Sequence, residues 1–114
     1  MVRTKQNFNM VSGDTQVLEY EVKDENGTAV AITGATIKWV VTASRNSTTA
    51  LVTKTTADGI SITNGAGGIF QVTLLPADTA SLSGNYYYET QVTTTSNSVY
   101  TVASGIASIE GDVA

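Results

Sequence analysis

The chain has 114 residues, a length that suits one domain with a hydrophobic core of its own. It contains neither cysteine nor histidine, which excludes disulfides, thiolate chemistry and the side chain most often used as a general base or metal ligand. Only 14% of the residues are charged and the net charge is −4, with Lys and Arg scattered along the chain. Nucleic acid is therefore not expected as a partner, because phosphate contacts need clustered basic residues.

Residues 1–7 form an N-terminal arm that we expect to be flexible. The arm has a basic start but no apolar run behind it, so it does not have the pattern of a secretory signal. The longest apolar stretches of the sequence are far too short to span a bilayer, and no membrane partner is expected.

Short alternating runs rich in Val, Ile, Thr and Tyr dominate the sequence, a pattern that predicts β-strands rather than helices. The expected strands are residues 15–23, 29–32, 36–43, 51–55, 60–63, 69–75, 85–93, 99–103 and 106–110. The alternation predicts that these strands direct the following side chains into a core: Leu18, Tyr20, Val22, Ile37, Trp39, Val41, Phe70, Val72, Leu74, Tyr86, Tyr88 and Val92. Turn signals such as Asn26-Gly27 separate the strands. Ser104-Gly105 is expected to kink the chain between the last two strands.

One stretch, Pro76 to Ser83, resembles a helix, because Pro suits a first helical position and Gly84 can end the turn. The pattern Leu82-x-Gly84-x-Tyr86 that follows resembles the tyrosine corner of sandwich domains, with Tyr88 where a cysteine usually stands. Turn signals every 8–12 residues predict an all-β fold, an immunoglobulin-like antiparallel β-sandwich of about 7–9 short strands. We expect one domain over residues 1–114, with residues 111–114 as a tail.

The polar motifs have plain structural explanations. Gly65-Ala66-Gly67-Gly68 precedes a strand and has no nearby lysine, so it predicts a turn and not a phosphate loop. Asp24, Glu25 and Asn26 predict a hairpin turn, since the spacing of a calcium loop is absent. Glu19 and Glu21 fall on the solvent face of their strand. No catalytic, cofactor-binding or metal-binding residues are predicted, and the chain is not expected to be an enzyme.

The aromatic residues offer the best candidates for an interaction surface. Trp39, Tyr86 and Tyr88 are expected in the core. Alternation turns Tyr87 the opposite way, and Tyr87 and Tyr100 are the candidates for an exposed protein interface or a platform on which a sugar stacks. An edge strand such as residues 51–55 is a further place where a neighbouring chain could pair.

Four segments in this order resemble a known family. They are Gly13-Asp14-Thr15, Asp24-Glu25-Asn26-Gly27, Thr33 to Trp39, and Ala77 to Thr93. They resemble the immunoglobulin-like N-terminal domain of bacteriophage baseplate upper proteins, and related small domains of phage tail and head proteins, across residues 8–110. The resemblance implies a protein of the virion, made in the cytoplasm of a bacterial host, that docks to other virion structural proteins, often as a homo-oligomer. It brings no catalytic residue and no cofactor, and leaves baseplate, tail and head roles open.

The function expected from the sequence is therefore that of a non-enzymatic phage structural or accessory protein acting by protein–protein docking. The alternative is a carbohydrate-binding or adhesin-type module, which the Thr- and Asn-rich loops and the two candidate tyrosines favour.

Overall fold

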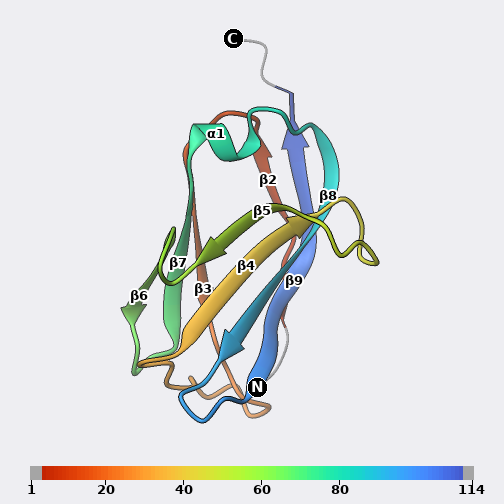
Figure 1. Cartoon of the computed structure of the whole chain (residues 1–114). Coiled ribbons are helices and arrows are strands. Elements are labelled where there is room, and N and C mark those ends of the chain that lie inside the picture. Colours follow the sequence, from red (N-terminus) through yellow and green to blue (C-terminus); the bar gives the residue numbers. More distant parts are fainter. Residues whose placement is uncertain (1–3, 112–114) are drawn as a thin grey trace.

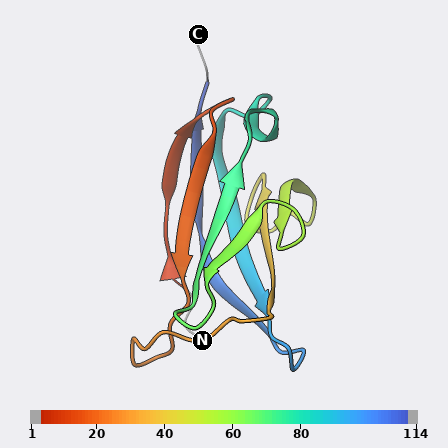
Figure 2. The same cartoon turned by 90° about the vertical axis from the view of Figure 1, so that its left-hand side faces the viewer.

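Two β-sheets lie face to face, with one short helix at one end of them (Figures 1 and 2), in a computed structural model that describes residues 4–111. The larger sheet has the strand order β1-β9-β8-β4-β5, and β2 continues along the same edge of β9 as β1. The smaller sheet has the order β3-β7-β6. The elements are β1 Thr4–Lys5, β2 Phe8–Val11, β3 Gln16–Glu21, β4 Thr36–Thr42, β5 Ala50–Thr55, β6 Ile60–Asn64, β7 Ile69–Leu74, α1 Pro76–Thr79, β8 Gly84–Thr93 and β9 Val99–Glu110.

The predicted β-rich sandwich is confirmed as a two-sheet fold, and the strands β4 to β8 begin and end close to their predicted bounds. The helical turn at Pro76 is confirmed as α1. This helix is the only one among residues 4–111, and no helix of that part is long and apolar enough to cross a membrane.

The N-terminal segment contains two strands, β1 and β2, that the sequence did not predict. Within the arm of residues 1–7, Thr4 lies opposite Ala103 of β9, and the Gln6 amide donates to the Ser104 carbonyl at 2.9 Å. Both strands run parallel to β9. Residues 1–3 of the arm and 112–114 of the tail lie outside the described residues.

The kink expected at Ser104-Gly105 is wrong, because β9 is one continuous strand of 12 residues. Gly105 has another use there. A Cβ atom on Gly105 would lie 2.3 Å from the Gln6 carbonyl oxygen, so only glycine lets the N-terminal segment approach β9 this closely.

The strand expected over residues 29–32 is also wrong. Ala29 makes a single bridge with Lys23, the Val30 amide donates to Val22, and the Ile32 amide donates to Gly65. The segment passes from the smaller sheet toward the larger one, so its backbone bonds go to two different partners and no ladder forms. Ile32 is nevertheless buried.

The core between the sheets is built around aromatic rings. Trp39 is fully buried, its ring centroid lies 5.7 Å from that of Tyr88, and its indole N–H donates to the Tyr20 hydroxyl at 3.3 Å. Tyr88 also contacts Phe8 and Tyr20. Aromatic packing therefore surrounds Tyr88, at the position of the tyrosine-corner pattern where a cysteine usually stands. The predicted core positions on β4 and β7 are buried, whereas Leu18 and Tyr86 are only half-buried.

In a tyrosine corner the hydroxyl of the tyrosine bonds to the backbone a few residues upstream, and Tyr86 makes such a contact. The Tyr86 hydroxyl donates to the Ser83 carbonyl at 3.0 Å and accepts from the Ser83 amide at 3.1 Å. The two bonds fix the chain between α1 and the start of β8.

Candidate functional site

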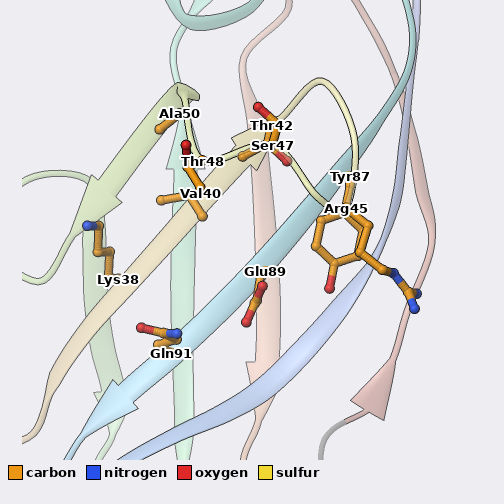
Figure 3. Close-up of a pocket in the computed structure, with 10 residues that line it drawn as sticks. All are labelled: Lys38, Val40, Thr42, Arg45, Ser47, Thr48, Ala50, Tyr87, Glu89 and Gln91. Carbon is orange, nitrogen blue, oxygen red and sulfur yellow. The ribbon is translucent and has the colours of Figure 1, made fainter.

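A groove lies on the outer face of the larger sheet, where the loop between β4 and β5 curls over β4 and β8 (Figure 3). Its volume is about 230 Å³, below the range of about 300–1,000 Å³ that drug-sized ligands occupy. The residues that line it are Lys38, Val40, Thr42, Arg45, Ser47, Thr48, Ala50, Tyr87, Glu89 and Gln91.

The register of β4 and β8 places the floor of the groove. Lys38 lies opposite Gln91, Val40 opposite Glu89, and Thr42 opposite Tyr87. Residues on a strand alternate between its two faces, and the residues between these on β4 point into the core. The same alternation that builds the core therefore lines up six side chains on the outer face.

The groove brings together charges of both signs. Lys38 and Arg45 are exposed cations, and the half-buried Glu89 carboxylate accepts a hydrogen bond from the Thr101 hydroxyl at 3.1 Å. Within residues 4–111, none of Lys38, Arg45 and Glu89 forms an ion pair with another described residue. These three charges are therefore available to a ligand or to another molecule.

Tyr87 is on the predicted outer face, but the expectation that its side chain is exposed is wrong. It is 7% exposed, and the guanidinium of Arg45 lies 5.3 Å from the centre of its ring. The Arg45 loop covers the ring, and a cation over an aromatic face is favourable. Alternation within a strand predicts the face on which a side chain lies. It does not predict whether a loop from elsewhere in the sequence covers that side chain.

Tyr100 is 40% exposed, as expected, but it does not lie beside Tyr87. Tyr87 is opposite Ile106, whereas Tyr100 is opposite Val92, whose side chain is buried. Opposed residues of an antiparallel pair share a face, so the two tyrosines are on different faces of the sheet. The register shift between Thr90 and Gln91 causes this change of face and gave no signal in the sequence.

The outermost strand of the larger sheet, β5, is a second candidate surface. Apart from a bridge between Thr55 and Gly59, its outer edge has no strand partner among residues 4–111. Leu51 is 43% exposed on it. Lys54 points inward instead, where its ammonium lies 2.7 Å from the Asp78 carboxylate and its carbon chain lies against Gly59.

The Lys54–Asp78 ion pair was not predicted from the sequence. The Asp78 carboxylate also holds the first turn of α1, since it accepts from the Leu75 amide at 2.7 Å. The available signal was the alternation of β5, which puts Val52 and Lys54 on the same inward face. An inward lysine needs a partner of opposite charge.

The other polar motifs keep their structural roles. The Asp24 carboxylate accepts from the Asn26 and Thr28 amides and so closes the predicted turn. Asn64 holds the Gly67 amide in the glycine-rich turn before β7. Across residues 4–111, no three or more His, Cys, Asp or Glu side chains are grouped so that they could hold a metal ion.

No protein-family model matches the chain, and no curated protein matches it. The likeness to baseplate domains therefore stands on the segments named above, and what it implies remains a proposal. The two candidate binding surfaces are the outer-face groove and the edge of β5.

Proposed function

We propose that this chain is a non-enzymatic structural or accessory protein of a bacteriophage particle, in the baseplate, tail or head, and that it works by docking to other virion proteins. The order β9-β8-β4-β5 in one sheet and β3-β7-β6 in the other matches strands G-F-C-C′ and B-E-D of variable-type immunoglobulin domains. That order supports the immunoglobulin-like topology of the resembled family. The lack of His and Cys in the sequence supports a role without catalysis.

The observation that supports the docking proposal is the outer edge of β5, which no strand among residues 4–111 covers. Native proteins usually protect an edge strand with charges, proline, a bulge or a covering segment, and β5 has only a register shift at Leu51. The exposed residues of β5 include Ala50, Leu51 and Thr53, which are uncharged, and the strand contains no proline. An incoming strand can use the unpaired backbone groups for affinity and the outward side chains for specificity.

An inward lysine on an edge strand ordinarily opposes strand addition, because the added strand would bury an uncompensated charge. Here the ammonium of Lys54 is already neutralised by Asp78 at 2.7 Å. A strand that pairs with β5 therefore meets no desolvation penalty from this lysine beyond the one that folding has already met.

Incorporation into phage particles tests the proposal. The variant Thr53→Lys places a charge on the β5 edge, and Ser61→Lys places the same charge on β6, the end strand of the smaller sheet. Tagged wild-type protein and Ser61→Lys should be found in purified particles by mass spectrometry, and Thr53→Lys should be at least about tenfold depleted, equivalent to about 1.4 kcal/mol. Absence of the wild-type chain from particles, or equal incorporation of both variants, would contradict the proposal.

The second candidate function is carbohydrate binding, which the outer-face groove favours. Its lining combines hydroxyl, amide and charged side chains with an aromatic ring, and these groups suit a ligand rich in hydroxyls. A glycan array on which the folded protein binds nothing would remove this candidate.

A further inference from the structure

We propose that the outer-face groove binds a short acidic oligosaccharide in which carboxylate-bearing sugars flank a neutral one. This inference rests on the second candidate function and names its ligand class and its contacts. Its charged contacts lie on β4, β8 and the Arg45 loop, and Ala50 is the one lining residue that the groove shares with β5.

The charge of the groove is opposite in sign to that of the whole chain. The whole chain has a net charge of −4, but the groove is lined by two cations, Lys38 and Arg45, and one carboxylate, Glu89. Two of the other described cations, Lys23 and Lys54, are occupied by ion pairs. The groove thus reverses the charge of the molecule and attracts a ligand with carboxylates.

The two cations lie at opposite ends of the groove, and the carboxylate lies between them. Lys38 lies at one end of the β4 stretch and Thr42 at the other, four residues away, or about 13 Å at the rise of a strand. Arg45 covers Tyr87, which is the partner of Thr42, so the second cation is at the Thr42 end. Glu89 lies between them, opposite Val40. The carboxylates of the ligand belong at the two ends.

The middle of the groove excludes a ligand that is anionic along its whole length. The Glu89 carboxylate would repel a third carboxylate, but it accepts hydrogen bonds from hydroxyl groups. Val40 offers methyl groups beside it, against which the C–H face of a sugar ring packs. A neutral sugar therefore fits the groove itself, whose volume is about 230 Å³, and the acidic sugars on either side of it extend beyond the groove to Lys38 and Arg45.

The position of the groove favours a sugar over a peptide. It lies on the face of the sheet, where the backbone groups of β4 and β8 are consumed by their own ladder. An extended peptide gains its affinity from backbone hydrogen bonds, which a sheet edge supplies and a sheet face does not. The polar contacts available here come from side chains, Thr48 and Gln91 among them.

Titration followed by two-dimensional NMR tests the inference with defined probes. The acidic probe is a hyaluronan hexasaccharide, in which a carboxylate-bearing sugar alternates with a neutral one. The uncharged probe is maltohexaose, and hexaglutamate represents an acidic peptide. The variants are Lys38→Gln, Arg45→Gln and, as a matched control that also removes one positive charge from the surface, Lys23→Gln.

Hyaluronan should shift the amides of β4, β8 and the Arg45 loop. Lys38→Gln and Arg45→Gln should each weaken its binding about tenfold, the loss expected for one charge-assisted hydrogen bond, while Lys23→Gln should bind like the wild type. Unchanged spectra in each variant before titration establish that its fold is intact.

Three results would contradict binding of any sugar in the groove. They are no binding of hyaluronan, shifts located away from the groove, and equal binding of hyaluronan and hexaglutamate. If maltohexaose binds the groove as well as hyaluronan does, carbohydrate binding survives and the acidic ligand class is wrong. Arg45→Gln should be incorporated into particles as well as the wild type is. The docking proposal can then be tested separately from the proposal of sugar binding in the groove.

Discussion

Breaking the Lys54–Asp78 pair should destabilise the fold by an amount that depends on which partner is removed. Only 7% of the Lys54 side chain is exposed, against 22% of that of Asp78. In Asp78→Asn the ammonium of Lys54 stays buried without a counter-charge. In Lys54→Met the carbon chain is replaced by an apolar one of similar reach, and Asp78 keeps the Leu75 amide and contact with water.

The magnitudes follow from this asymmetry. Removing one partner of a fully buried ion pair costs about 3–5 kcal/mol, and the partial exposure of Asp78 lowers the figure for Asp78→Asn to about 2–3 kcal/mol. Lys54→Met should cost about 1 kcal/mol, since no charge is left fully buried. The double variant should cost about as much as Lys54→Met alone, because the stranded charge is gone.

Urea unfolding of the four proteins at neutral pH measures these differences. The exposed Lys23–Glu21 pair is the control, and Lys23→Met should change the unfolding free energy by less than about 1 kcal/mol. The reasoning is refuted if Asp78→Asn costs no more than Lys54→Met, or if the double variant shows the sum of the single effects.

Three further predictions concern the core and the N-terminal segment. Trp39→Ala should lower the unfolding free energy by about 3–5 kcal/mol in urea, and a loss below about 1 kcal/mol would contradict its burial. Burial raises the pKa of Tyr20 well above its ordinary value of about 10, so the stability it contributes is present below about pH 10 and is lost above it, when the unfolded chain ionises. Tyr20→Phe should therefore lose less stability than the wild type between about pH 9 and 11, and parallel pH profiles of urea unfolding would count against this. Gly105→Ala should speed hydrogen exchange of the Gln6 amide about tenfold by NMR, because the new Cβ pushes the segment off β9, and unchanged exchange would show that the contact relaxes at little cost.

The strands that were predicted correctly share one physical feature. β4, β7 and β8 alternate large apolar with polar side chains, because each has one face on the core and one face on the outside. The missed strand β2 shows the same pattern, with Phe8 and Met10 directed at the core, but it has only four residues and is paired through β9, about a hundred residues away in sequence. Such a short strand is stabilised by its distant partner and not by local propensity.

The surfaces were harder to predict than the core. Alternation predicted that Tyr87 lies on the outer face of its strand. It could not predict that the Tyr87 ring is covered, because Arg45 contacts the ring from a loop more than forty residues earlier in the sequence. The groove depends on the same loop and on the pairing of β4 with β8. The segment over residues 29–32 has the composition of a strand, yet the need to cross between sheets decides its conformation.

The parallel pairing of β1 and β2 with β9 has a mechanical consequence. The first described pair joins Thr4 to Ala103 and the last joins Val11 to Glu110, so the segment and β9 run side by side over eight residues, or about 23 Å. A pull that draws Thr4 and Glu110 apart along this direction strains the hydrogen bonds of the pairing together, in shear, and does not open them one after another. The fold can therefore carry tension between its two ends without first peeling a strand from its edge.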